Sequence, residues 1–179
     1  NMPEWSMINS IEPSAFDEGT CSVAATRYKM GDFTPYLYKT EDYGKSWRLI
    51  TKGINSEHFT RVLREDPSKK GLLYAGTETG MYISFDDGKA WSAFQLNLPI
   101  VPITDLAVKN NSLIVATQGR SIWMIDDLTV LHQLDASTAS KEAVLFKPKD
   151  AYRTKGGARK GSLTEGENMP AGVVTHLYV

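Results

Sequence analysis

The chain has 179 residues, enough for one ordinary domain or for one domain with a tail. It carries 20 basic and 21 acidic residues, and this balance argues against a nucleic-acid-binding domain, which should be clearly basic. No stretch approaches the roughly 18 consecutive apolar residues of a membrane-spanning helix, so we expect no membrane insertion. Cys21 is the only cysteine, which excludes an intramolecular disulfide and a zinc site built from cysteines.

The first predicted elements in chain order are four short strands within residues 5–54. Apolar patterns at residues 8–11, 23–26 and 37–40 predict three strands, and a fourth follows Trp47. The same order returns over residues 55–98, where the predicted strands begin near Phe59, Tyr74, Met81 and Trp91. Four short antiparallel strands in a repeat of this length are typical of one blade of a β-propeller.

A tight turn between the third and fourth strands has the same sequence pattern in both repeats. Residues 40–47 and 84–91 superpose without gaps on Ser/Thr-x-Asp-x-Gly-x-x-Trp, and their Asp residues are 44 positions apart. We expect the Asp side chain to accept hydrogen bonds from backbone N–H groups one or two residues ahead. The Gly supplies a positive φ, the hydroxyl supports the turn, and the Trp ring packs beneath it. We therefore assign structural roles to Thr40, Asp42, Gly44, Trp47, Ser84, Asp86, Gly88 and Trp91.

A third, degenerate repeat follows over residues 99–148. Three strands are predicted between Ile103 and Asp127, but Thr129 stands where the glycine should be and the closing Trp is absent. A short apolar run at residues 143–146 is interpreted as the closing strand of this repeat. The sequence thus predicts an all-β fold of three propeller blades in an incomplete ring, because propellers need about four or more blades to close.

The remaining residues are predicted to leave the propeller. Residues 149–168 are interpreted as a linker, because their segment 154–161 has almost no apolar content to bury. Residues 169–179 regain a strand-like pattern, with no strand after them to pair with. We interpret these residues as the first strand of a following domain, and we expect that domain to be a β-sandwich.

The repeated turn resembles the Asp-box, or bacterial neuraminidase, repeat, and both copies match at every fixed position. Longer stretches at residues 35–40, 119–128 and 145–148 resemble large bacterial sortilin-like or xyloglucanase-like propeller proteins. The resemblance implies that the chain is the C-terminal part of a propeller in a larger, exported protein with a C-terminal sandwich, although no signal peptide is visible. Members are often labelled glycosyl hydrolases on fold alone, and no motif in this chain matches their catalytic aspartates.

The resemblance also implies that the turn motifs lie on the face of the propeller away from the binding site. The opposite face, here called the loop face, holds the connections between strands two and three and between strand four and the next repeat. Its longest loop is predicted at residues 26–36, and long loops on a rigid scaffold often carry function. The candidate binding residues on this face are Arg27, Tyr28, Asp32, Glu57, His58, Glu78, Gln118 and Arg120.

Simpler interpretations of these candidates stay open. The long loop is equally well explained as an ornamental surface loop, and Arg120 as a partner in a structural ion pair. His58 has no second His or Cys at metal-ligand spacing, so we predict no metal and no cofactor.

Two classes of function remain open at this point. The first is a non-catalytic binding or scaffolding module that engages a glycan or a peptide through the loop face. The second is part of a glycoside hydrolase acting on a β-glucan such as xyloglucan, which needs two carboxylates about 5 to 10 Å apart. Asp32, Glu57 and Glu78 lie on this face, but none stands in a diagnostic motif, so catalytic residues stay unassigned. The expected partners are the rest of a propeller or a second copy of the chain, because open blade edges favour association.

Overall fold

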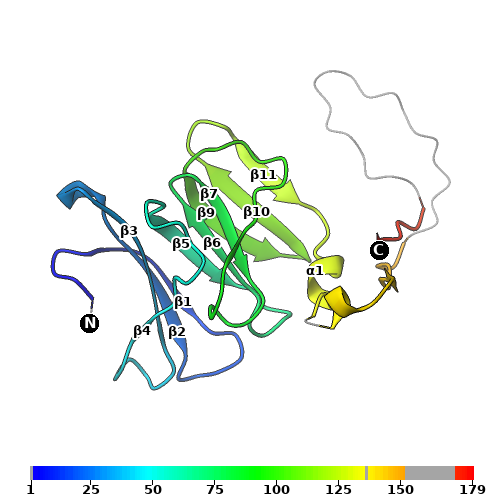
Figure 1. Ribbon diagram of the computed structural model, residues 1–179, viewed down its shortest axis with the longest axis horizontal. Coiled ribbons are helices and arrows are strands. Elements are labelled where there is room, and N and C mark those ends of the chain that lie inside the picture. Colours follow the sequence, from blue (N-terminus) through cyan, green and yellow to red (C-terminus); the bar gives the residue numbers. More distant parts are fainter. Residues whose placement is uncertain (1, 136, 152–171) are drawn as a thin grey trace. The chain divides into compact units, whose positions relative to one another are not determined.

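The computed structural model describes residues 2–135, 137–151 and 172–179, and the chain divides into two compact units, Asn1–Asp127 and Leu128–Val179. In the first unit, three antiparallel sheets lie side by side in chain order (Figure 1). The first sheet contains β1 (Met7–Pro13), β2 (Cys21–Arg27), β3 (Asp32–Thr40) and β4 (Arg48–Leu49). The second contains β5 (Thr60–Glu65), β6 (Leu73–Thr77), β7 (Gly80–Ser84) and β8 (Ser92–Ala93). The third contains β9 (Ile103–Lys109), β10 (Ser112–Thr117) and β11 (Ile122–Ile125).

Each of these sheets is a meander in which consecutive strands pair. All residues of β6 and β7 are buried, because the second sheet has a neighbouring sheet on each side. Strands buried on both faces have continuous apolar sequences, as these two strands do. In β11 of the third sheet, by contrast, exposed and half-buried residues alternate, as expected for a strand with one open face.

One core cluster of the first unit lies between the first and second sheets. Its buried side chains are Ala24, Leu37, Ile50, Ile54, Leu63, Leu73, Ala75, Tyr82 and Trp91. The indole N–H of Trp91 donates a hydrogen bond to the carbonyl oxygen of Ile50 over 2.6 Å. The backbone N–H of Trp91 donates to the carbonyl oxygen of Lys52 over 2.8 Å. Trp91 therefore ties the second sheet to the residues that follow β4.

The first strand of each sheet lies next to the first strand of the following sheet. An ion-pair network crosses these three strands: the Arg64 guanidinium on β5 lies 3.4 Å from the Glu12 carboxylate on β1 and 2.7 Å from the Asp105 carboxylate on β9. Burial raises the pKa of Glu12, although the N–H of Glu65 and the Arg64 charge both act in the opposite direction. The network therefore links the three sheets through paired charges, of which Glu12 and Arg64 are partly buried and Asp105 is exposed.

The third sheet has three strands, which differs from the prediction of a closing strand at residues 143–146. In the structure β12 (Val144–Leu145) pairs with β13 (Leu177–Tyr178) inside the second unit. Thr129, at the position of the motif glycine, begins helix α1 (Thr129–Gln133), and a 3-10 turn follows at Thr138–Ser140. A β-branched residue disfavours the positive φ of a tight turn, so the chain enters a helix instead of a hairpin.

The predictions for the tail are tested only in part. The predicted linker falls largely on residues 152–171, which lie outside the described residues. Among residues 172–179, the strand Leu177–Tyr178 finds its partner in β12, whereas the sequence predicted a strand without a partner in this chain. A following domain stays a prediction.

Candidate functional site

The two turn motifs are residues 40–47, called the first motif, and residues 84–91, called the second motif. In the first motif, the Thr40 hydroxyl accepts the N–H of Gly44 over 2.9 Å, and the Asp42 carboxylate accepts the N–H of Ser46 over 2.9 Å. The Ser46 hydroxyl also donates to Asp42 over 2.6 Å. These bonds from the Ser46 hydroxyl and N–H lower the pKa of Asp42 to about 2.

The second motif repeats this geometry but lacks the Ser46 hydroxyl bond to the Asp carboxylate, because Ala90 stands at the position of Ser46. The Ser84 hydroxyl accepts the N–H of Gly88 over 3.0 Å, and Asp86 accepts the N–H of Ala90 over 2.9 Å. Partial burial opposes the ionisation of Asp86, but the bonds from Ala90 and Ser84 outweigh it and lower its pKa. In both motifs the backbone donor to the Asp side chain lies four residues ahead, so the expectation of a donor one or two residues ahead was wrong.

Two consecutive residues of each turn have a positive φ, whereas the sequence predicted a positive φ only for the glycine. Gly44 and Gly88 have φ of 81° and 78°, and the preceding Tyr43 and Asp87 have φ of 60° and 63°. Two left-handed residues in a row bring the N–H four positions after the Asp back to its carboxylate.

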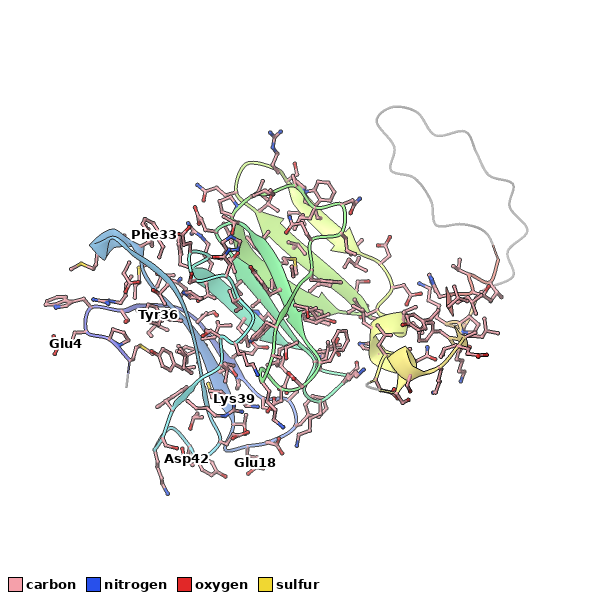
Figure 2. All side chains as sticks on the ribbon, viewed as in Figure 1. Glu4, Glu18, Phe33, Tyr36, Lys39 and Asp42 are labelled. Atoms are coloured by element: carbon pink, nitrogen blue, oxygen red, sulfur yellow. The ribbon has the colours of Figure 1, made fainter. Side chains whose placement is uncertain are left out.

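The loop between β2 and β3 lies at the other end of the first sheet from the first motif. Figure 2 shows Phe33 and Tyr36 toward one end of β3, with Lys39 and Asp42 toward the other. The loop is shorter than the predicted residues 26–36, because β2 and β3 extend into it and leave a 3-10 turn, Tyr28–Met30, with Gly31 at a φ of 74°.

Five side chains at the loop face form what is here called the aromatic cluster: Tyr28, Phe33, Phe59, Arg61 and Glu78. The rings of Tyr28 and Phe59 stack with centroids 5.1 Å apart, and the Phe33 ring lies 6.0 Å from that of Phe59. The Arg61 guanidinium carbon lies 5.4 Å from the Phe59 centroid, within cation–π range. Arg61 also pairs with Glu78 at 2.5 Å. Phe33 is 51% exposed, Tyr28 is half-buried and Phe59 is buried, so one exposed aromatic ring lies over a packed aromatic base beside a paired charge.

A second ion pair lies next to the aromatic cluster along the chain. Arg27 and Asp32 pair at 2.7 Å across the ends of β2 and β3, and the Tyr36 hydroxyl donates to Asp32 over 2.8 Å. Burial opposes the ionisation of Asp32, but hydrogen bonds from Tyr36 and Thr34 and the Arg27 charge outweigh it and lower its pKa. Asp32 is therefore an ionised, fully engaged carboxylate at neutral pH and has no proton to donate.

Two of the predicted site residues, Tyr28 and Glu78, belong to the aromatic cluster, and two others, Arg27 and Asp32, form the neighbouring ion pair. Among the described residues, no hydrogen bond, ion pair or ring contact links the other four candidates to the aromatic cluster. The side chains of Glu57, Gln118 and Arg120 are exposed, and His58 Nδ1 lies 2.8 Å from the Tyr82 hydroxyl.

Sequence reasoning missed Phe33, Phe59 and Arg61 as members of this site. Phe59 was placed at the start of a predicted strand, Arg61 was not singled out, and Phe33 was noted only as part of a loop. Phe59 and Arg61 are two positions apart, a spacing typical of side chains on one side of an extended chain, and that signal could have found them.

Across residues 2–135, 137–151 and 172–179, no group of three or more His, Cys, Asp and Glu side chains is arranged to hold a metal ion. Within the same residues, no helix has the length and apolar character needed to cross a membrane.

No protein-family model matches this chain, and no curated protein matches its sequence. Solved structures match its fold. YCF48 from Cyanidioschyzon merolae is 18% identical with a TM-score of 0.50, over 71% of this chain and 36% of that chain. An ancestral GH74 enzyme is 18% identical with a TM-score of 0.49, over 63% of this chain and 14% of that chain. YCF48 bound to D1 peptide is 20% identical with a TM-score of 0.46, over 66% of this chain and 37% of that chain.

The chain therefore spans between 14% and 37% of the length of these structures. At such low identity the likeness to YCF48 from Cyanidioschyzon merolae bears on the fold alone. Together with the three meander sheets, it confirms the predicted all-β fold of propeller blades in an incomplete ring.

Proposed function

We propose that this chain is a non-catalytic binding module that takes a peptide on its loop face. The observation that carries the proposal is the aromatic cluster, in which the exposed ring of Phe33 lies beside stacked rings and the pair of Arg61 and Glu78. Aromatic rings supply a large contact area at low entropy cost, and arginine is often a main contributor to binding energy. A polypeptide offers the mixture of apolar side chains and charged or polar groups that matches this surface.

Two of the three candidate carboxylates of the loop face, Asp32 and Glu78, support binding over hydrolysis. A glycosidase needs one carboxylic acid with a raised pKa to protonate the leaving group. Asp32 has a lowered pKa and is held by Arg27, and Glu78 is paired with Arg61. These carboxylates suit the charged border of a binding surface.

The test is a screen of the chain against a displayed peptide library and a glycan array, followed by titration of the best ligand. We expect peptide ligands, and we expect Phe33→Ala to weaken their binding about tenfold or more, as for a central aromatic contact. Phe85→Ala is the matched control, since Phe85 is 42% exposed and directly precedes Asp86 of the second motif. Binding of glycans alone, release of sugar from xyloglucan, or equal losses in the two variants would contradict the proposal.

We also propose that another blade, from the rest of a propeller or from a second copy, covers the free side of the first sheet. An apolar pocket there is lined by Met2, Ile8, Ile11, Val23, Tyr38 and Trp47. Val23 pairs with Tyr38 across the sheet as Ala75 pairs with Tyr82 in the second sheet. The second pair belongs to the core that the first sheet covers, so the first pair faces the free side of its own sheet, where Ile8 and Ile11 are 44% and 64% exposed.

Size-exclusion chromatography with light scattering tests the second-copy form of this proposal. We expect a mass of twice the chain or more, falling to the single-chain mass in Ile11→Glu with an unchanged circular dichroism spectrum. A well-folded monomer at high concentration would exclude self-association, and the covering blade would then have to come from the rest of a propeller. Export stays a prediction that rests on the resemblance alone.

A further inference from the structure

A cavity lies between the second and third sheets, apart from the aromatic cluster. Its apolar lining includes Met81, Phe94 and Leu98 from β7 and the segment after β8, and Val115 and Trp123 from the third sheet. The enclosed volume is about 40 Å³, and the cavity is partly open to solvent.

These lining residues repeat, position by position, the residues that surround Trp91 in the core between the first and second sheets. In order along the chain, Leu37, Ile50, Ile54, Ala75 and Tyr82 of that core correspond to Met81, Phe94, Leu98, Val115 and Trp123 of the cavity. The backbone supports this correspondence, because the N–H of Ile50 donates to Leu37 and the N–H of Phe94 donates to Met81, each over 2.8 Å.

Two further features extend the correspondence. Ile54 and Leu98 each close a turn by donating an N–H to the carbonyl three residues before, over 3.1 Å and 2.8 Å. Val115 pairs with Trp123 across the third sheet as Ala75 pairs with Tyr82 across the second. The two inter-sheet spaces therefore have the same architecture.

The third repeat has no tryptophan at the position of Trp91, and its Trp123 corresponds instead to Tyr82. Trp91 stands five residues after Asp86, and the residue five positions after Asp127 is His132, which lies in helix α1. The cavity thus occupies the position that the Trp91 indole fills between the first and second sheets. The carbonyl oxygen of Ile50 accepts the indole N–H of Trp91, and Phe94 provides a carbonyl at the corresponding position of the cavity.

We propose that this cavity binds the indole ring of a tryptophan presented by a partner polypeptide. The apolar walls suit a planar aromatic ring, and the Phe94 carbonyl suits its single N–H donor. The enclosed volume of about 40 Å³ is smaller than the roughly 150 Å³ of an engineered apolar cavity that accepts benzene. Part of the ring would therefore lie in the open mouth, beside Leu96 and Met124, which are 68% and 57% exposed.

The test uses the whole chain labelled with ¹³C in its methionine methyl groups. Met81 and Met124 line the cavity, and Met30 on the β2–β3 loop serves as the internal control. Titration with N-acetyltryptophanamide should shift the Met81 and Met124 signals in a saturable way and leave Met30 unchanged. N-acetylleucinamide should produce no comparable shift, and free indole separates recognition of the ring from recognition of the flanking peptide groups.

Two substitutions of Leu98 should act in opposite directions. Leu98→Ala enlarges the cavity and should tighten binding of N-acetyltryptophanamide, whereas Leu98→Phe fills it and should weaken binding at least tenfold. Ile54→Ala, at the corresponding position beside Trp91, is the matched control and should leave binding unchanged. Equal shifts with the leucine compound, tighter binding of free indole than of the amide, or a folded Leu98→Phe with wild-type affinity would overturn the proposal. Phe33→Ala should not alter these shifts, which separates this site from the loop-face proposal.

Discussion

The first and second motifs form the same hydrogen-bonded turn, but their tryptophans have different surroundings. Trp91 is 4% exposed, and its indole donates to Ile50 of the neighbouring sheet. Trp47 is only half-buried, and its indole donates to Gly44 of its own motif over 3.2 Å. The turn is therefore a local property of the motif, whereas the contribution of its tryptophan to stability depends on a second sheet.

The residue before the motif glycine shows the same contrast. Asp87 pairs with the buried ammonium group of Lys39, which reaches it from the first sheet. Tyr43, at the corresponding position of the first motif, is 73% exposed. Trp91 and Asp87 of the second motif therefore form contacts between sheets, whereas at the same positions of the first motif Trp47 is half-buried and Tyr43 is exposed.

The largest effect is expected from removing the two tryptophans in turn. Trp91→Ala should lower the free energy of unfolding by about 3–5 kcal/mol, because it leaves a large cavity in the core. Trp47→Ala should cost less than about 1 kcal/mol, as for a side chain near the surface. Urea unfolding followed by circular dichroism measures both values.

Trp91→Phe is the control for the hydrogen bond. It keeps most of the aromatic packing but leaves the Ile50 carbonyl without the indole N–H, which should cost about 1–3 kcal/mol. Equal destabilisation by Trp47→Ala and Trp91→Ala would mean that the neighbouring sheet does not determine the contribution of the tryptophan.

A smaller difference is expected between the motif glycines. Both have a positive φ, which costs an alanine about 1 kcal/mol or more. A Cβ on Gly88 would also lie 2.8 Å from Cδ1 of Ile50, whereas the nearest atom to a Cβ on Gly44 is 3.8 Å away. Gly44→Ala should therefore cost about 1 kcal/mol and Gly88→Ala about 2–3 kcal/mol. Thermal unfolding of the two variants measures this difference, and a larger loss for Gly44→Ala would contradict the argument.

The sequence predicted those parts of the fold that depend on local chemistry. The spacing of Asp42 and Asp86 identified the repeat, and the resulting blade architecture is confirmed. The strand partner of residues 143–146 was predicted wrongly. The pairing of Val144–Leu145 with Leu177–Tyr178 joins segments that are far apart in the chain. A strand-like run shows that a strand can form, but its partner depends on contacts that a single sequence does not reveal.

The candidate site was predicted less completely than the fold. Arg27, Tyr28, Asp32 and Glu78 were expected on the loop face because they sit in connections between strands. Phe59 was predicted only to begin a strand, and its buried ring forms the base on which Tyr28 stacks. Such contacts join two sheets, and they become visible only when the sheets are placed side by side.

The smallest expected effect concerns the Asp side chains of the two motifs. The two Asp side chains differ mainly in the residue four positions ahead. The Ser46 hydroxyl donates an additional hydrogen bond to Asp42, whereas Ala90 has no hydroxyl and donates to Asp86 through its N–H alone. Ser46→Ala should raise the pKa of Asp42 from about 2 toward its ordinary value, and Ala90→Ser should lower the pKa of Asp86 further. NMR titration of the carboxyl carbons measures both values.

The consequence for stability follows from the sign of this shift. The pKa of Asp42 in the folded chain is about 2, below its unfolded value of about 3.9, so the ionised carboxylate stabilises the fold above pH 4. That contribution is lost as the pH falls from about 4 to about 2, and Asp42→Asn should make the melting temperature depend less on pH in this range. Ser46→Ala should have part of the same effect. If Ser46→Ala and Ala90→Ser left both pKa values unchanged, the hydroxyl bond would not distinguish the motifs, and the two turns would be electrostatically equivalent.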